Sequence, residues 1–301
     1  MQAHPWYEDE QLLRTLPLYL RGYGVYLRRM LSPATGLVRG GSFLLRRIQD
    51  LIRWRGLPRA QAFRVDGLTV SVDLLDNRWL WVLEELQGMS AEAQLVERTL
   101  GPGGTLLDIG ANHGSYTLLA GRRVGPTGRV VAFEPQPFLA RLVRQSLESN
   151  GMRHGTVHEL ALGEQAGSAT FFIPAAGSGS GGLHAAFSAR GQHERLEVRV
   201  ARLDELLPEP LPRENSLVKL DCEGGELGAL RGGRRALSAL PPVLLELNSQ
   251  AASAAGYSLA ELRDELRVIG YRHFAELSSP SRLEPLETMP LLPLRNVVVL
   301  A

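Results

Sequence analysis

Short apolar runs alternate with longer amphipathic segments from residue 101 to the end of the chain. The runs have the length of buried strands, and the segments between them repeat their apolar positions at the spacing of a helix face. Strands are predicted at 105–109, 129–133, 156–160, 217–220, 243–247 and 296–300, and helices at 113–123, 137–149, 226–240 and 259–269. Because this alternation is typical of a parallel sheet covered on both faces, it predicts a doubly wound, mainly parallel α/β fold.

Two further segments have the alternating pattern of β-hairpins. Residues 61–76 alternate around an Asp-Gly turn signal and predict a lead-in hairpin. Residues 168–173 and 196–200 predict an inserted hairpin that interrupts the α/β alternation, and the glycine-rich segment 177–182 separates its two strands. Such a segment is either a mobile lid or a tolerated insertion, and the pattern leaves both open.

The first 60 residues differ from the rest of the chain in charge. They hold ten arginines and four acids, a net charge of +6, which leaves −5 for the other 241 residues because the whole chain carries +1. One helix face in this part is apolar and is formed by Leu44, Ile48, Leu51 and Ile52. A basic amphipathic helix more often caps a neighbouring domain, although it can also lie on an anionic membrane. We therefore predict a basic, partly helical extension over 1–60, with peripheral membrane contact as the alternative role.

Length and composition fit one α/β domain after that extension, over 61–301 with its core at 101–301. Of the 301 residues, 44% are apolar and 22% are charged, which is ordinary globular usage. The net charge gives no reason to expect a nucleic-acid partner. The single cysteine, Cys222, excludes an intramolecular disulfide and a cysteine-based metal site. With no basic and apolar leader and no run of about 18 apolar residues, the sequence predicts a cytoplasmic protein.

The most informative motif, Leu-Leu-Asp-Ile-Gly-Ala-Asn-His-Gly, occupies residues 106–114, directly after the first core strand. Glycines at this edge of an α/β sheet let a cofactor approach the backbone. The spacing Gly-x-x-x-Gly differs from the Gly-x-Gly-x-x-Gly that a dinucleotide pyrophosphate requires. An aspartate there would repel a pyrophosphate but suits an ammonium or sulfonium group. The motif therefore favours S-adenosylmethionine over NAD, with contacts predicted at Asp108, Gly110, Ala111, Asn112 and Gly114.

Residues after the next two strands complete the predicted cofactor site. Glu134, followed by Pro135, ends the second core strand and lies 20 residues after Gly114. An acid at this place accepts hydrogen bonds from ribose hydroxyls in nucleotide-binding folds. Ala161 follows the third strand and offers a small side chain beside which an adenine could lie.

An acidic cluster follows the fourth strand, in the motif Lys-Leu-Asp-Cys-Glu-Gly-Gly-Glu over residues 219–226. Lys219 is the only lysine of a chain with 32 arginines, which indicates that a compact ammonium group is needed beside the acids. A structural ion pair in a strand-to-helix turn is the alternative explanation. Because acids at this edge usually face a ligand, we predict a catalytic site of Lys219, Asp221 and Glu223, with Glu246 at the end of the fifth strand.

Together, the segments 107–114, 132–135 and 219–226 resemble the FkbM family of S-adenosylmethionine-dependent methyltransferases, over roughly residues 101–246. The resemblance implies a class I methyltransferase fold, which is Rossmann-like and has a seven-stranded sheet with its last strand antiparallel. It also implies O-methylation of a hydroxyl group on a sugar, a glycan or another small metabolite. His113 departs from the family pattern, in which an apolar residue is commoner, and we expect it to alter the pocket wall without removing cofactor binding.

Methyl transfer to a hydroxyl group needs a partner that accepts its proton. We expect Asp221 or Glu223 to accept it, Lys219 to orient these acids and Glu246 to border the acceptor pocket. The same acids could instead hold Mg²⁺, but no spacing typical of metal ligands is present and no metal site is predicted. Two other functions remain open: an NAD-dependent oxidoreductase, which the glycine spacing disfavours, and a non-catalytic cofactor-binding or interaction protein, which the acids disfavour.

Overall fold

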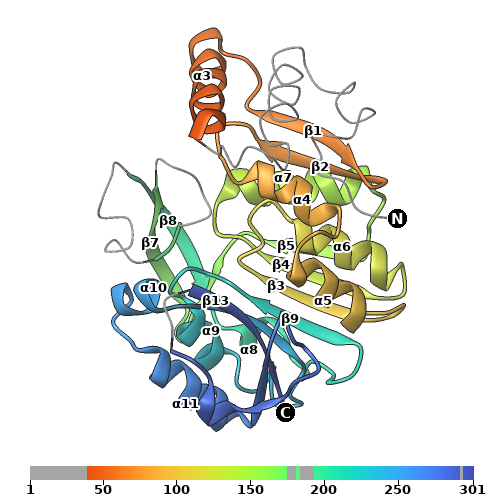
Figure 1. Ribbon diagram of the computed structural model, residues 1–301, viewed down its shortest axis with the longest axis vertical. Coiled ribbons are helices and arrows are strands. Elements are labelled where there is room, and N and C mark those ends of the chain that lie inside the picture. Colours follow the sequence, from red (N-terminus) through yellow and green to blue (C-terminus); the bar gives the residue numbers. More distant parts are fainter. Residues whose placement is uncertain (1–38, 175–180, 184–192, 292–293) are drawn as a thin grey trace.

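The computed structural model describes residues 39–174, 181–183, 193–291 and 294–301, and an eight-stranded, mainly parallel sheet lies at its centre (Figure 1). In spatial order the strands are β12 (Glu284–Pro285), β11 (His273–Glu276), β13 (Leu294–Leu300), β10 (Val243–Asn248), β9 (Ser216–Leu220), β3 (Thr105–Ile109), β4 (Arg129–Phe133) and β5 (Gly155–His158). Neighbours from β10 to β5 are parallel, whereas β13 runs antiparallel to both β10 and β11. The predicted α/β fold, with its last strand antiparallel, is confirmed, and the two-residue β12 adds an eighth strand at one edge.

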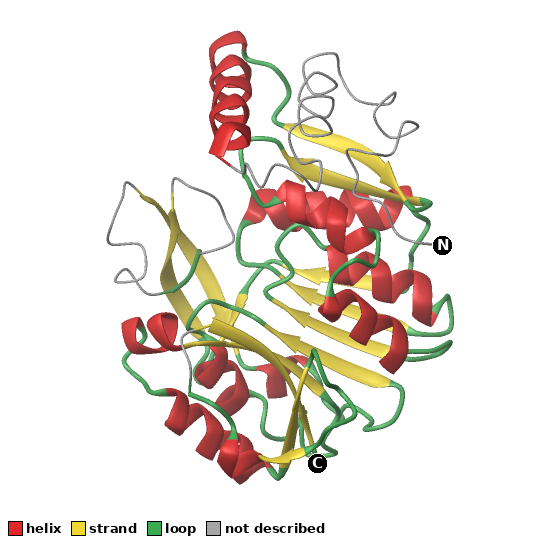
Figure 2. Ribbon diagram, viewed as in Figure 1, coloured by secondary structure: helices red, strands yellow, loops and turns green. Residues whose placement is uncertain are grey.

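Helices cover both faces of this sheet (Figure 2). The helices are α3 (Arg39–Arg55), α4 (Trp79–Leu86), α5 (Ala91–Thr99), α6 (Ser115–Val124), α7 (Pro137–Ser149), α8 (Leu203–Leu206), α9 (Glu226–Gly232), α10 (Ser249–Ala254) and α11 (Leu259–Ile269). Alternate residues of a strand point to opposite faces. In β3, Leu106 therefore packs with α4 to α7, whereas Leu107 and Ile109 pack with α9 and α11. With both faces packed, the carboxyl edge of the sheet is where a ligand site is expected.

The predicted lead-in hairpin packs on α7 (Figure 1). Its strands are β1 (Ala60–Val65) and β2 (Leu68–Asp73). Helix α7 satisfies the open edge of β2, because Ser146 Oγ accepts a hydrogen bond from the N–H of Ser71 and Asn150 Oδ1 accepts one from the N–H of Thr69, both at 2.9 Å. The hairpin thus joins the helical layer on one face of the central sheet.

Helix α3 adds to the same core with its apolar face. Ile48 and Ile52 are buried and belong to the cluster that contains the hairpin, so these two residues cap the domain and are not free to meet a membrane. Trp54, near the end of the helix, is 75% exposed. The side chain of Leu44 and all of 1–38 lie outside the described residues. Among the helices that are described, none is long and apolar enough to cross a membrane.

A second sheet of three strands follows β5 (Figure 1). It is formed, in spatial order, by β6 (Ala161–Leu162), β8 (His193–Ala201) and β7 (Gly167–Pro174). Strands β7 and β8 are antiparallel and form the predicted inserted hairpin. Gly182 returns to this sheet, since its N–H and C=O groups hydrogen-bond to those of Phe172 at 3.1 and 2.8 Å. Residues 175–180, which include 177–180 of the glycine-rich segment, lie outside the described residues.

Three of the boundaries that differ from the prediction have a clear structural cause. Strand β5 ends at His158, because the next residues leave to pair with β8 in the second sheet. Helix α6 begins at Ser115, because Gly114 has a φ of 82°, which a right-handed helix does not contain. Helix α9 ends at Gly232, the first of two adjacent glycines, which weaken a helix. Strand β11, which completes the seven strands, was not predicted from the apolar pattern.

Candidate active site

The loop after β3 passes directly beside the turn after β9. The backbone N–H of Asp221 donates a hydrogen bond to Ile109 O at 3.2 Å. A Cβ placed on Gly110 would lie 1.8 Å from the carbonyl oxygen of Asp221, and Gly110 has a φ of 81°. Only glycine fits such a position. It brings the carboxyl ends of two neighbouring strands into one site.

Glu134 fixes this loop from the end of β4. Its side chain is buried; Oε2 accepts a hydrogen bond from the N–H of Asn112 at 2.8 Å, and Oε1 accepts one from the N–H of Gln136 at 2.9 Å. Burial raises the pKa of Glu134 to about 7, although the two hydrogen bonds oppose this. Each carboxylate oxygen can accept a second hydrogen bond. Glu134 can therefore also bind hydroxyl groups of a ligand.

Asp108 lies beneath the loop and is fully buried. Its Oδ2 accepts a hydrogen bond from Thr117 Oγ1 at 2.6 Å, and its Oδ1 lies 3.9 Å from Lys219 Nζ with no hydrogen-bond partner among the described residues. Burial raises the pKa of Asp108, an effect that Lys219 and Thr117 oppose. Asp108 therefore affects the site electrostatically, through its neighbour Lys219.

Lys219 connects the two strand ends. It is 5% exposed, and its Nζ donates hydrogen bonds to Asp221 Oδ2 at 3.0 Å and to Gly110 O at 3.3 Å. Burial alone would lower the pKa of Lys219, but Asp221 and Asp108 raise it above its usual value. The ammonium group therefore stays charged and holds Asp221 in a fixed orientation.

Glu226, the last acid of the same motif, holds the turn after β9. Its Oε1 accepts a hydrogen bond from the N–H of Cys222 at 2.9 Å, and its Oε2 accepts one from the N–H of Gly224 at 3.0 Å and one from Tyr257 Oη at 2.8 Å. The side chain is 3% exposed. Its hydrogen bonds therefore hold the turn, whereas Asp221 and Glu223, the two acids before it, line the pockets.

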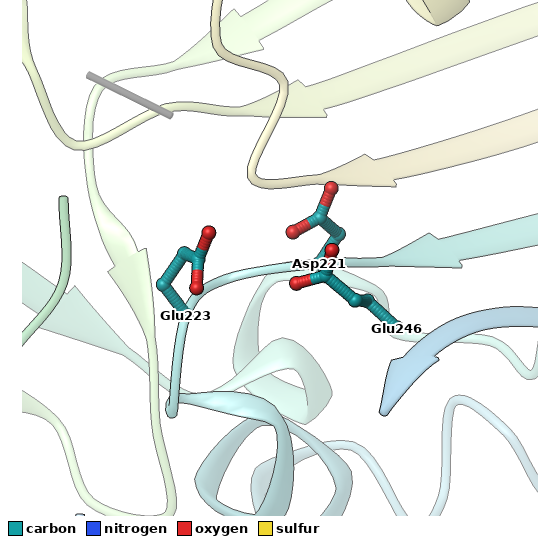
Figure 3. Close-up of side chains that lie close together, drawn as sticks. All are labelled: Asp221, Glu223 and Glu246. Atoms are coloured by element: carbon teal, nitrogen blue, oxygen red, sulfur yellow. The ribbon is translucent and has the colours of Figure 1, made fainter. Parts of the chain in front are cut away.

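Three carboxyl groups meet beyond this turn (Figure 3). Asp221 and Glu223 follow β9, Glu246 comes from β10, and one oxygen of each lies within 4.8 Å of the others. Glu223 Oε2 accepts a hydrogen bond from Asn248 Nδ2 at 3.2 Å, whereas Glu246 Oε2 is buried with no partner among the described residues. Burial and the neighbouring acids raise the pKa of Glu223 to about 8 and that of Glu246 to about 9. Because like charges so close resist ionising together, the cluster holds protons at neutral pH.

Two adjoining pockets open around these acids. The loop after β3, the end of β4, the turn after β9 and the second sheet line the first pocket. Its lining includes most of the predicted cofactor residues: Gly110, Ala111, Asn112, Glu134, Pro135 and Ala161. The second pocket lies toward α4 and α5 and is bordered by Glu246. Asp221 and Glu223 line both pockets.

Two of the predicted cofactor residues, Asp108 and Gly114, lie behind the lining of the pockets. A Cβ on Gly114 would lie 2.9 Å from a methyl group of Val143, so this glycine lets α6 and α7 pack closely. His113 lies in the wall of the first pocket, as expected; it is fully buried, and burial lowers its pKa. The histidine is therefore neutral at physiological pH.

Several residues of the pocket walls were not predicted. Arg78 and Tyr116 line both pockets, Leu160 and Phe171 line the first, and Trp81, Glu84, Glu85 and Glu92 line the second. Arg78 donates a hydrogen bond to Glu85 Oε1 at 2.5 Å, and Ser115 donates one to the other oxygen of Glu85. Tyr116 follows the glycine motif by two positions and could have been expected there. No motif marks Arg78, which the fold brings in from a distant part of the chain.

A comparison with known families identifies this arrangement. The Methyltransferase FkbM domain matches residues 108–273, more than half of the chain. The chain belongs to the FkbM family of methyltransferases. The family domain includes both strand ends and the three clustered acids, whereas the wall that α4 and the start of α5 form lies before it.

Individual relatives of this FkbM-family chain differ from it considerably. The hexuronic acid methyltransferase AglP of Haloferax volcanii is 26% identical over 186 residues, which are 62% of this chain and 73% of that protein. The solved FkbM methyltransferase of Methylobacillus flagellatus is similar with a TM-score of 0.40 and 17% identity, over 75% of this chain and 55% of that one. M. jannaschii TYW2, solved in complex with AdoMet, has a TM-score of 0.45 and 10% identity, over 80% of this chain and 84% of that one.

Proposed function

We propose that this FkbM-family protein uses S-adenosylmethionine to methylate a hydroxyl group of a sugar or another small polyhydroxylated molecule. The observation that carries the proposal is the junction of two pockets at Asp221 and Glu223. A methyl donor in the first pocket and an acceptor in the second would meet beside carboxyl groups that can take up a proton. The similarity to a hexuronic acid methyltransferase supports a sugar as the acceptor.

The first pocket fits the parts of S-adenosylmethionine. Glu134 would hold the ribose hydroxyls, because each of its oxygens can accept one more hydrogen bond. Leu160 and Ala161 provide an apolar wall for the adenine. Asp221, with the buried Asp108 behind it, supplies negative charge for the ammonium and sulfonium groups, and Glu223 offers carboxyl oxygens beside them.

The charges of this pocket disfavour NAD. The lysine and the arginine that line it are each bonded to an acid, Lys219 to Asp221 and Arg78 to Glu85. A pyrophosphate would therefore meet paired cations and a cluster of carboxyl groups. No backbone cradle of the Gly-x-Gly-x-x-Gly type accompanies them in the sequence.

Bound S-adenosylmethionine supplies an electrophilic methyl group, and the protein must align the acceptor hydroxyl and receive its proton. Glu223 suits the second task, because a base with a pKa of about 8 is well matched to neutral or mildly basic conditions. Asp221 keeps one oxygen on Lys219 and has the other for the acceptor. Glu246 borders only the second pocket and would orient the acceptor there.

A magnesium ion is the alternative partner of the three carboxyl groups, whose oxygens lie within 4.8 Å of one another. The ammonium group of Lys219, 3.0 Å from Asp221 Oδ2, would repel such an ion. We therefore expect initial rates of methyl transfer that do not change when EDTA is added. A rate that falls with EDTA and returns with Mg²⁺ would assign the acids to a metal site instead.

Titration calorimetry tests the cofactor. We expect the protein to bind S-adenosylmethionine and S-adenosylhomocysteine and not NAD. Glu134→Gln should weaken the binding of S-adenosylmethionine and of S-adenosylhomocysteine by about tenfold or more. The glutamine side chain has one acceptor oxygen where the carboxylate has two, and hydrogen bonds to charged groups contribute roughly 1.5–3 kcal/mol. Glu148→Gln, the same change on the exposed side of α7, serves as the control and should bind as the wild type does.

Two results would contradict the proposal. Binding of NAD alone would indicate an oxidoreductase, and equal affinity of the Glu134→Gln and wild-type proteins for S-adenosylhomocysteine would remove the ribose assignment. Circular dichroism of both variants verifies that they are folded.

A further inference from the structure

The second pocket is a cavity of about 460 Å³, within the range of roughly 300–1,000 Å³ that small-molecule sites occupy. It meets the first pocket at the three acids of Figure 3. Much of its wall comes from residues 78–92, which precede the matched family domain at 108–273. This part of the cavity wall therefore lies outside the matched family domain.

The cavity is lined by many acids. Its carboxyl groups are those of Glu84, Glu85, Glu92, Asp221, Glu223 and Glu246. Arg78 is the one cation among the described lining residues. Glu85 neutralises it through a hydrogen bond of 2.5 Å, and the other terminal nitrogen, Nη1, is buried and has no partner among the described residues. No exposed cation of the described lining thus offers itself to an anionic ligand.

Apolar groups lie beside this acidic wall. Trp81 is 54% exposed and Met89 is 39% exposed, and both line the cavity with Tyr116. Trp81 belongs to α4, whose side chains Trp79, Val82, Leu83 and Leu86 are buried in the core. An exposed aromatic ring next to hydrogen-bond acceptors suits a ligand with an apolar face and a polar edge. A pyranose ring has this combination, with C–H groups on its faces and hydroxyl groups around its rim.

From these observations, and resting on the methyltransferase function proposed above, we propose that the methyl acceptor is an uncharged polyhydroxylated ring. Trp81 would contact the ring face and the surrounding carboxyl groups would accept its hydroxyl hydrogens. A hexuronic acid is disfavoured, because its carboxylate would meet Glu84 and Glu92, and Arg78, the one cation of the described lining, is already paired with Glu85. The acceptor would then differ in charge from the substrate named for the Haloferax volcanii relative.

Matched pairs of sugars test this selectivity. The methyl glycosides of glucose, galactose and mannose are each compared with the methyl glycoside of the corresponding hexuronic acid, which carries a free carboxylate. Release of S-adenosylhomocysteine is measured for each. We expect the uncharged member of any pair that reacts to have a kcat/KM at least about tenfold higher, because a carboxylate placed against the acids of the wall is repelled by their like charge. Glu84→Arg should reduce that preference, and Glu148→Gln should leave it unchanged. A hexuronate that reacts as well as its uncharged partner would overturn the proposal.

Fluorescence quenching tests the charge of the cavity without an acceptor. The contribution of Trp81 is the difference between the wild-type and Trp81→Phe proteins, because the exposed Trp54 and the other two tryptophans are present in both. We expect caesium ions to quench Trp81 more efficiently than iodide, and Glu84→Gln to reduce this preference. If no sugar pair reacts, this measurement decides, and equal or stronger quenching by iodide would overturn the inference.

Calorimetry with S-adenosylhomocysteine on the same preparation separates the two proposals. Binding together with preference for a hexuronate would refute only the uncharged acceptor. Absence of binding would refute the cofactor assignment, and the acceptor assignment with it, whatever the quenching shows.

Discussion

Replacement of Glu223 by glutamine tests the proton transfer in this FkbM-family protein. Glutamine has nearly the same shape but cannot accept the proton of a hydroxyl group. Glu223 borders both pockets, and Asn248 Nδ2 donates a hydrogen bond to its Oε2 at 3.2 Å. The amide oxygen of glutamine can keep that hydrogen bond, so the substitution should remove the base and little else.

The magnitude follows from the protonation of the cluster. Burial, Asp221 and Glu226 raise the pKa of Glu223 from 4.5 to about 8. With such a pKa, about one tenth of the protein holds the ionised base at pH 7 and about nine tenths at pH 9, so the wild-type rate should rise about tenfold over this range. A general base contributes roughly 10²–10⁴ in rate, or about 2.7–5.4 kcal/mol of transition-state stabilisation. Glu223→Gln should lose both the rate and its rise with pH.

Initial rates of S-adenosylhomocysteine release between pH 6 and pH 10 measure both effects, with calorimetry to verify that the variant still binds S-adenosylhomocysteine. Asp221→Asn provides a comparison, because it also removes the carboxylate partner of Lys219, and we expect it to abolish turnover. A Glu223→Gln variant that keeps more than a tenth of the wild-type rate, with the same pH profile, would refute the reasoning. The proton acceptor would then have to be sought at Asp221.

Three further predictions concern stability and membrane contact. Gly110→Ala should lower the free energy of unfolding by more than about 3 kcal/mol, because its Cβ would displace the backbone of Asp221. The control Gly67→Ala has a similar φ of 79° and no atom within 4 Å of its added Cβ, so it should lower this free energy by only about 1 kcal/mol. Urea denaturation measures both losses, and equal losses would contradict the prediction. Burial and the neighbouring acids raise the pKa of Glu246 from 4.5 to about 9 in the folded protein, so the stability that its acid form contributes at low pH is lost as the pH rises. The Tm of Glu246→Gln relative to wild type should therefore increase from about pH 5 to pH 9, and a constant difference would contradict the burial argument. Because Ile48 and Ile52 of α3 are buried in the core, we expect the protein to float little with phosphatidylserine vesicles. If the wild-type protein floats and Trp54→Ala does not, α3 makes peripheral membrane contact.

The parts of the fold that the sequence predicted best are governed by local periodicity. Strands β3 and β4 and helices α7 and α11 occupy the predicted residues. The two strands are short apolar runs, the two helices repeat their apolar positions at one spacing, and Pro137 and Ser258 mark the helix starts. Strand β11 was missed because its four residues carry too short a pattern. The end of β5 depends on a strand 30 or more residues away, which periodicity does not detect.

The residues of the candidate site also fall into two groups, those that a local motif marks and those that tertiary packing brings in. Motif spacing identified the residues at the strand ends, including Glu134 and the three clustered acids. It assigned Glu223 and not Glu226 to the catalytic site, but it did not reveal that Glu226 holds a turn, because that role depends on hydrogen bonds from Tyr257 and from backbone groups. Arg78 and Trp81 were missed because tertiary packing brings α4 to the site, and neither residue has a local signal.

A crystal structure of the protein with S-adenosylhomocysteine tests the central claim most directly, namely that two pockets meet at the acids after β9. We predict ribose hydroxyls within hydrogen-bond distance of the Glu134 carboxylate and a sulfur atom facing Asp221 and Glu223, with the cavity beside Trp81 open for the acceptor. A ligand bound elsewhere, or one whose sulfur atom faces away from these acids, would contradict the account.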